Sequence, residues 1–286
     1  MSFFKSILFL SFKDGFSTAM SLKKQLTLLK NSSRTRQIMV KAMLLNGIFW
    51  LGSLYLIEHL FNSPDQHHIH GLSYKVITGY PLYLFCLFVN SRLFDQIAKS
   101  TLQLQQSTPF YYSSTNSTNN TSWSSIIYVM SFYGNCALFI LFIRQIPYIG
   151  LALGFIFNSV IMAYYCFEYK WIELGWTQEH RMSFVEQHWP YFLGFGLPVT
   201  FLTYFLSTLH AGAIFALFYP SFIINANIGT TKFNQQPTYF KIPIFLIIRT
   251  LNRLILSTIR LINVKLFEKL MDHNQGNNKD ALGKFV

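Results

Sequence analysis

Long apolar runs constrain the fold of this chain more than any other feature of its sequence. They extend for about 15–21 residues, and a helix needs about 20 apolar residues to cross roughly 30 Å of hydrocarbon. Only 12% of the residues are charged, whereas a soluble domain usually carries about 25%. The strands of a membrane barrel would alternate apolar and polar residues, which these runs do not. The sequence therefore predicts an all-α polytopic membrane protein, because a helix satisfies its own backbone hydrogen bonds in lipid.

Six apolar segments are predicted to be transmembrane or hemi-penetrating helices. Short turns near Gln145–Pro147 and His210–Gly212 join the third segment to the fourth and the fifth to the sixth. These two hairpins either cross the bilayer or dip in and return, and the sequence leaves both alternatives open. The segments are Ala42–Phe61, Val76–Leu93, Ser125–Ile143, Ile146–Phe167, Tyr191–Leu209 and Ala211–Asn225.

Amphipathic helices that lie in the membrane interface are predicted at both ends of the chain. The N-terminal one contains the apolar run Phe3–Phe12, and Lys13, Lys23 and Lys24 form its wet side. The C-terminal one covers Ile242–Met271. A third amphipathic stretch, Asn90–Leu104, is predicted to leave the membrane after the second segment.

Lysine and arginine gather at the two ends of the chain, whereas Asn62–Ser73 has neither. The positive-inside rule therefore places both termini in the cytosol, in agreement with an even number of spans. The net charge of +12 then faces the anionic cytosolic leaflet of the lipid bilayer, which is the predicted partner; nucleic acid is not expected. Glycosylation sequons in this topology would stay unused; they are at Asn31, Asn116, Asn119 and Asn120.

Three regions follow from these patterns. Residues 1–41 form a basic cytosolic arm with an amphipathic helix, 42–227 form the six-helix membrane domain, and 228–286 form a basic cytosolic C-terminal region with a second amphipathic helix. Within the membrane domain, 113–125 is rich in Ser, Thr and Asn and is predicted to be a low-complexity cytosolic loop. Residues 168–190 are predicted to be a charged cytosolic connection.

Ionisable side chains crowd this connection, while the flanking apolar segments carry almost none. Charge is costly in hydrocarbon, so the connection is expected in water or at the interface. We predict that Glu168 or Glu186 pairs with Lys170 or Arg181 and locks the two hairpins together. The residues that make up the candidate motif are Glu168, Lys170, Trp171, Glu179, His180, Arg181, Glu186, Trp189, Pro190, Gly194, Gly196 and Pro198.

Aromatic and small residues accompany the charges. Indole and phenol rings favour the headgroup level of a bilayer, so Trp171, Trp176, Trp189 and Tyr191 are expected to anchor the connection at the cytosolic interface. Gly194 and Gly196 are expected to let a neighbouring helix approach closely. Within the apolar segments, Asn135 and Asn158 are expected at similar depth, where they either hydrogen-bond each other or line a polar path.

No catalytic constellation is present in the sequence. It has no GxSxG, HExxH or phosphate-binding glycine loop, so we expect no enzyme activity and no cofactor. The cysteines Cys86, Cys136 and Cys166 form no CxxC pair and are expected to pack as apolar residues. His67, His68 and His70 cluster in one loop, where solvation is favoured over a metal site, so no metal is predicted.

Several longer motifs resemble the etoposide-induced protein 2.4 family, whose bacterial relatives are CysZ-type sulfate permeases. The resemblance is strongest at three segments and extends from about Met39 to Leu254, most of the chain. Weaker agreement lies at Asn46-Gly-Ile-Phe-Trp50 and Tyr80-Pro-Leu-Tyr83. The three segments are Tyr165-Cys-Phe-Glu-Tyr-Lys-Trp171, Glu186-Gln-His-Trp-Pro-Tyr-Phe-Leu-Gly-Phe-Gly-Leu-Pro198 and Pro220-Ser-Phe-Ile-Ile-Asn-Ala-Asn227.

The resemblance implies a multi-pass membrane protein of the endoplasmic reticulum that acts in autophagy without an enzymatic activity, with cytosolic autophagy proteins as partners. The bacterial branch implies the alternative, an anion permease or channel for sulfate-like ions. A permease needs cations or helix N-termini where an anion loses its water. The apolar segments offer few candidates, such as Arg144 and Lys170, and this sparseness favours the first interpretation. The animal members have a longer, arginine-rich N-terminal region, which here is reduced to Lys23–Lys41.

Overall fold

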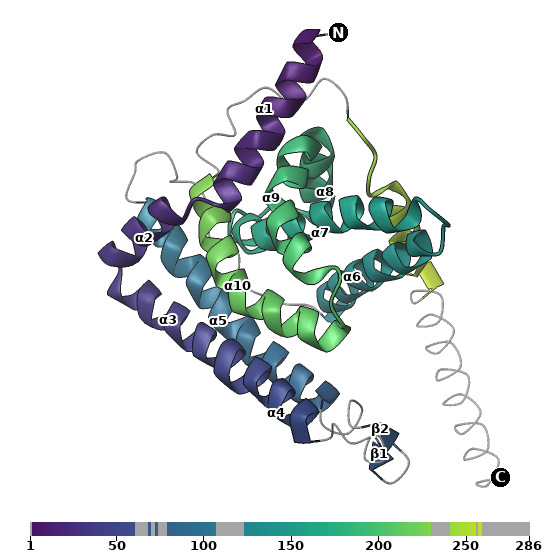
Figure 1. Cartoon of the computed structure of the whole chain (residues 1–286). Coiled ribbons are helices and arrows are strands. Elements are labelled where there is room, and N and C mark those ends of the chain that lie inside the picture. Colours follow the sequence, from purple (N-terminus) through teal and green to yellow (C-terminus); the bar gives the residue numbers. More distant parts are fainter. Residues whose placement is uncertain are drawn as a thin grey trace, which may run out of the picture. The chain divides into compact units, whose positions relative to one another are not determined.

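A computed structural model (Figure 1) describes residues 2–60, 68–69, 72–73, 79–106, 123–229, 241–255 and 257–258. Nearly all of these residues are helical, which confirms the predicted all-α class. A two-stranded antiparallel pair is the exception; β1 (His68–Ile69) pairs with β2 (Leu72–Ser73) so that His68 is opposite Ser73. The predicted loop 113–125 ends earlier than expected, because α6 begins at Trp123. Residues 113–122 with their sequons, His67, His70 and the chain after residue 258 lie outside the described residues.

The helices divide into two compact units. Unit 1 comprises residues 1–118 and 146–242, and unit 2 comprises 119–145 and 243–286. Unit 2 contains α6 (Trp123–Arg144) and a helix over residues 246–255. The helices of unit 1 are α1 (Ser2–Ala19), α2 (Leu22–Asn31), α3 (Ser33–Leu44), the π-helix η1 (Leu45–Leu51), α4 (Gly52–Leu60), α5 (Tyr80–Gln106), α7 (Gly150–Glu173), α8 (Gln178–Gln187), α9 (Trp189–Thr203) and α10 (Thr208–Gly229).

Three helices among the described residues are long and apolar enough to cross a membrane. They are α7, α10 and the continuous helix Ser33–Leu60, which joins α3, η1 and α4. The last has 28 residues, about 42 Å at 1.5 Å per residue, more than the roughly 30 Å of a hydrocarbon core. The described residues therefore contain three candidate membrane-spanning helices, while the count of six inserted segments stays a prediction.

Some predicted boundaries are wrong. The second segment and the amphipathic stretch after it form one unbroken helix, α5. The turn expected at His210–Gly212 lies instead at 204–207, between α9 and α10. Ser207 directly precedes α10 and its hydroxyl is 2.7 Å from Nδ1 of His210, in keeping with the preference for serine at a helix N-terminus. The predicted turn near Gln145–Pro147 is confirmed, since α6 ends at Arg144 and α7 begins at Gly150.

In unit 1, α5 and α10 pack along the helix Ser33–Leu60 (Figure 1). Polar contacts mark three levels of this packing. The hydroxyl of Thr35 donates to Ser100 at 3.1 Å at one end, and Glu58 contacts His210 at 3.2 Å at the other. Between these two contacts, Asn46 of η1 hydrogen-bonds to Asn90 of α5 at 2.9 Å. The three helices are thus held in one register along their length.

Helix α1 packs on α9, and two glycines make the approach close. A methyl group added at Gly15 would overlap the carbonyl oxygen of Tyr191, and one added at Gly194 would overlap that of Phe12. Helix α1 therefore packs directly on another helix, and its predicted position in the membrane interface stays a prediction. Residue 41, the predicted end of the N-terminal arm, lies inside α3.

Unit 2 is held by polar and aromatic contacts between its two helices. The Ser131 hydroxyl and the Asn135 amide both donate to Oδ1 of Asn252, and the Phe132 ring lies 5.9 Å from the Phe245 ring. Asn135 and Asn158 belong to different units, and each has a partner within its own unit; a bond between the two stays a prediction. Asn158 donates to Thr200 of α9 at 3.5 Å.

Candidate functional site: the charged cluster of α7 and α8

Five ionisable residues gather where α7 ends and α8 runs, and we call them the charged cluster: Glu168, Lys170, Arg181, Glu186 and Lys241. Helix α7 continues through Glu173, and α8 occupies Gln178–Gln187, with Thr177 accepting from the backbone N–H of His180 as its N-cap. The predicted connection 168–190 is therefore mostly helix. Only residues 174–177 and 188 lie between the helices.

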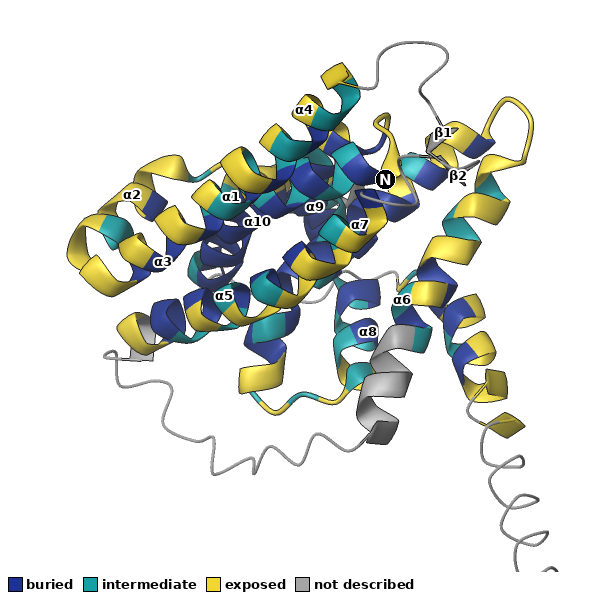
Figure 2. Ribbon diagram, turned by 90° about the horizontal axis from the view of Figure 1, so that it is seen from below, coloured by how far each residue is buried: buried dark blue, intermediate teal, exposed yellow. Residues whose placement is uncertain are grey.

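Burial is the main correction to the sequence analysis. Glu168 is 7% exposed, Lys170 1% and Glu186 0%, so these three face the protein interior and not water. Figure 2 shows that α9 and α10, which pack beside α7, contain many buried residues. Glu179 and His180, at the start of α8, are exposed as expected. The charges are buried because they lie on the faces of α7 and α8 that pack against other helices, where each has a polar partner.

Glu168 and Arg181 form the ion pair that the sequence predicted, at 3.5 Å. About a tenth of each side chain is exposed. Arg181 also donates from Nε and Nη2 to the backbone carbonyl of Trp176, at 2.9 and 2.7 Å. The guanidinium thus joins α8 to α7 and to the turn between them, and its fixed geometry suits this three-way contact.

Lys170, the alternative to Arg181 in the predicted pairing, donates instead to the backbone carbonyl of Asn227 at 3.0 Å. The Asn227 side chain in turn donates to the Ala98 carbonyl and the Thr101 hydroxyl of α5. Two residues earlier, the Asn225 amide donates to the carbonyl of Ala19, at the end of α1. The end of α10 therefore holds α1, α5 and α7 together through two asparagines.

Glu186 is paired with Lys241 at 3.4 Å, and Lys241 also donates to Ser183 at 3.0 Å. The carboxylate is buried while nearly half of the lysine side chain is exposed. Lys241 lies far along the chain from Glu186, in the region predicted to be a separate cytosolic tail. Nothing in the local sequence pattern indicated this partner.

Aromatic rings fill the interior beside the charged cluster. Trp171 is 1% exposed, lies stacked 6.0 Å from Trp176 and packs against Phe167 and Phe192. Tyr191 is also buried. The expectation that Trp171 and Tyr191 anchor at the headgroup level is therefore wrong, because their rings are used in helix packing. Trp176 and Trp189 are partly exposed.

The remaining motif residues shape α9. Trp189 and Pro190 open the helix, where a missing backbone N–H is tolerated, and Pro198 lies inside it. A methyl group added at Gly196 would overlap the carbonyl oxygen of Ser159 in α7. Since Gly194 faces α1, the two glycines let α9 approach a helix on each of two sides.

Two groups at the borders of the cluster have shifted pKa values. Burial lowers the pKa of His188, partly offset by its contact with the Phe184 carbonyl at 2.9 Å from Nδ1. The hydrogen bond from Lys99 to Asp95 raises the pKa of the Lys99 ammonium. Lys99 lies 3.0 Å from Asp95 and 3.6 Å from Glu173, so it links α5 to the end of α7.

Sequence reasoning missed a second polar site, at η1. Asn46 and Asn90 exchange two hydrogen bonds at 2.9 and 2.7 Å, and Asn46 also donates to the carbonyls of Ala42 and Ala216. Both asparagines are buried. The available signal was an asparagine in each of two apolar segments. A π-helical turn often marks a functional position in a helix.

The chemistry of the charged cluster is that of structural contacts. Its charges are taken up by ion pairs and backbone carbonyls, and no group of three or more His, Cys, Asp or Glu residues suited to a metal occurs among the described residues. The three cysteines are buried free thiols. The arrangement joins α1, α5, α7, α8 and α10 into one frame.

Comparison with known proteins agrees with this picture. The family model described as Sulfate transporter CysZ/Etoposide-induced protein 2.4 matches residues 21–220. The Protein EI24 homolog of Dictyostelium discoideum is 30% identical over 246 residues, which cover 81% of this chain and 78% of that protein. The Protein EI24 homolog of Arabidopsis thaliana is 30% identical over 303 aligned positions, which cover 87% of this chain and 94% of that protein.

A shorter match is to Ectopic P granules protein 4 of Caenorhabditis elegans, which is 34% identical over 82 residues. These cover 28% of this chain and 26% of that protein. No solved structure gives a significant match. The family match spans most of the chain and includes most of the charged cluster, together with the glycines of α9. This chain belongs to the family of the sulfate transporter CysZ and etoposide-induced protein 2.4.

Proposed function

We propose that this chain is a non-enzymatic, multi-pass protein of the endoplasmic reticulum membrane that acts in autophagy, in autophagosome formation or cargo degradation. The observation that carries the proposal is the match to two proteins named EI24 homologs over 78% and 94% of their lengths. The buried charges support the non-enzymatic part, because Glu168, Lys170 and Glu186 each have a structural partner.

The proposed topology has six inserted segments and both termini in the cytosol. Helix α9 has 15 residues, about 22 Å, and is too short to cross roughly 30 Å of hydrocarbon, so it enters the bilayer and ends within it. The basic regions 1–41 and 228–286 lie against the anionic cytosolic leaflet. Tags at either terminus are then digested by protease added to sealed microsomes, and glycosidase leaves the mobility of the protein unchanged.

The start of α8 is the proposed contact for cytosolic autophagy proteins. Glu179 and His180 are exposed there, whereas Arg181 holds the fold. The role is tested by autophagic flux in cells that lack the protein, rescued by the wild type or by Glu179→Ala/His180→Ala. We expect undegraded cargo in the null cells, rescue by the wild type and poor rescue by the double variant at equal membrane levels. Normal flux in the null cells would reject the role.

An anion permease is the second candidate, since the description of the matching family includes a sulfate transporter. The structure offers it little support, because Lys170, one of the cations that could meet an anion, is buried and donates to a backbone carbonyl. Sulfate uptake into proteoliposomes distinguishes the two functions. Uptake above that of empty vesicles, together with normal flux in null cells, would make the permease the better assignment.

A further inference from the structure

Two hollows lie beside α2 in unit 1. The first, of about 440 Å³, is lined by Lys24, Thr27, Leu28, Asn31, Leu104 and Ile228. The second, of about 510 Å³, is lined by Ser17, Met20, Ser21, Leu22, Lys23, Lys24 and Thr27. Lys24 and Thr27 line both, so one ammonium and one hydroxyl serve two adjoining hollows.

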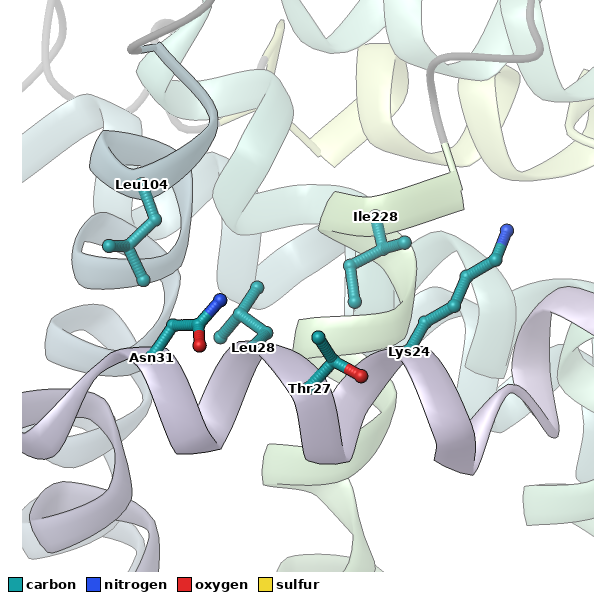
Figure 3. A pocket seen from close by; sticks show the side chains of 6 residues that line it. All are labelled: Lys24, Thr27, Leu28, Asn31, Leu104 and Ile228. Atoms are coloured by element: carbon teal, nitrogen blue, oxygen red, sulfur yellow. The ribbon is translucent and has the colours of Figure 1, made fainter.

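The lining of the first hollow is divided between polar and apolar groups. Figure 3 shows Lys24, Thr27, Leu28 and Asn31 projecting from one side of α2, with Leu104 of α5 and Ile228 of α10 beyond them. Leu28, Leu104 and Ile228 supply three aliphatic side chains from three helices. A molecule with a polar head and an apolar body matches this division, and the volume lies within the roughly 300–1,000 Å³ range of ligand sites.

The charges of the residues around α2 indicate that the polar head of the bound molecule is an anion. The sequence has no acidic residue from Gly15 to Ile57, while it has Lys23, Lys24, Lys30, Arg34, Arg36 and Lys41 in that stretch. An ammonium in such surroundings attracts an anion, and a phosphate oxygen is a good acceptor for it. The Asn31 amide supplies a further donor beside the hollow.

The exposed face of α2 indicates that the anion is part of a membrane. Leu22 and Leu26, one helical turn apart, are 58% and 57% exposed, and Lys23, Lys24 and Lys30 are exposed on the same helix (Figure 2). Exposed leucines beside lysines are typical of a helix at the boundary of headgroups and acyl chains. A free phosphate would leave these leucines and the aliphatic lining unused.

We propose that the hollow formed by α2, α5 and α10 binds one anionic phospholipid, with its phosphate on Lys24, a second headgroup oxygen on Asn31 and the start of an acyl chain on Leu28, Leu104 and Ile228. The site uses the membrane insertion of the chain but does not depend on a role in autophagy. In this proposal the site on α2 distinguishes anionic from uncharged lipid headgroups. The basic residues outside the hollow then supply only the diffuse attraction of a charged surface.

The test is native mass spectrometry of the full-length protein in detergent, titrated with phosphatidylserine or with phosphatidylcholine of the same acyl chains. We expect the wild type to retain phosphatidylserine. Lys24→Gln weakens that retention by about fivefold or more, because it removes the ammonium that contacts the phosphate, whereas Lys30→Gln, on the same helix but outside the lining, changes it less than about twofold. Leu28→Gln weakens retention of both lipids, and the exposed Leu26→Gln does not.

Three results would overturn the proposal: equal retention of the two lipids by the wild type, equal losses in Lys24→Gln and Lys30→Gln, or displacement of the lipid by inorganic phosphate. The third would assign the hollow to a free anion. Thermal unfolding of each variant checks its fold, and Asn31→Leu replaces Lys24→Gln if the latter unfolds. The lipid-binding test and the autophagic-flux test are independent. A negative result in the first does not change what the second says about the proposed function.

Discussion

Glu168 near the end of α7 and Arg181 in α8 form an ion pair at 3.5 Å that is almost closed off from solvent. The pair spans the turn between the two helices, and Arg181 also holds the Trp176 carbonyl in that turn. Because desolvated charges are costly alone, the pair makes the position of α8 dependent on both residues.

Removing one partner is therefore expected to destabilise the protein strongly. Glu168→Gln or Arg181→Gln leaves the other charge without its ion-pair partner in a nearly buried position, at a cost of up to about 3–5 kcal/mol. Thermal unfolding in detergent measures the loss, and the double variant is expected to lose less than the sum of the two single changes. Glu179→Gln, at an exposed position, is the control and is expected to stay within about 0.5 kcal/mol. Additive losses would show that the two residues act independently.

The glycines of α9 give a second prediction. Gly194→Ala and Gly196→Ala place a methyl group against the backbone of α1 and α7 respectively, and overpacking of this kind costs about 1–3 kcal/mol. Gly134→Ala in α6 is the matched control, because no atom lies within 4 Å of an added methyl group there. It is expected to be neutral or to stabilise its helix by about 0.5–1 kcal/mol. Unfolding midpoints that fall equally in all three variants would argue against close packing of α9.

The asparagine pair at η1, Asn46 and Asn90, gives a third prediction. Asn90→Leu removes the partner of Asn46 and leaves its buried amide and carbonyl groups partly unsatisfied. Hydrogen bonds between membrane helices contribute about 0.6–2 kcal/mol, so a loss of that size is expected in steric-trapping or detergent unfolding. Asn46→Leu/Asn90→Leu is expected to recover part of it, since two apolar side chains leave neither partner unsatisfied. No recovery would indicate that Asn46 acts through the carbonyls of Ala42 and Ala216 alone.

His188 gives a prediction about pH. Its pKa is lowered by burial, so the folded state favours the neutral ring and binds fewer protons than the unfolded chain. The stability that depends on the neutral ring is therefore present in full above the unfolded pKa of about 6.5 and is lost as the pH falls below it. Unfolding midpoints between pH 7.5 and 5.5 are expected to fall less in His188→Gln than in the wild type. The control His180→Gln removes an exposed histidine at the start of α8. If both variants changed the pH dependence equally, the assignment to His188 would be wrong.

The sequence by itself determined the all-helical membrane class, because long apolar runs with little charge allow few other folds. It also predicted the turn near Gln145–Pro147, and it included the contact of Glu168 with Arg181 among the alternatives of two carboxylates and two cations. Both are local features in which a short chain segment limits the partners that a residue can reach. The family resemblance was likewise carried by contiguous motifs.

Only the tertiary structure decided which charges are buried and what they meet. Lys170 meets a carbonyl 57 residues away in sequence, and Asn225 meets the end of α1 from a distance of 206 residues. At such separations many polar groups compete as partners, and the choice depends on which helix faces pack together. The packing of α1 on α9 was unpredictable for the same reason. Gly15 and Gly194 permit a close approach, but their positions in sequence do not say which helix approaches.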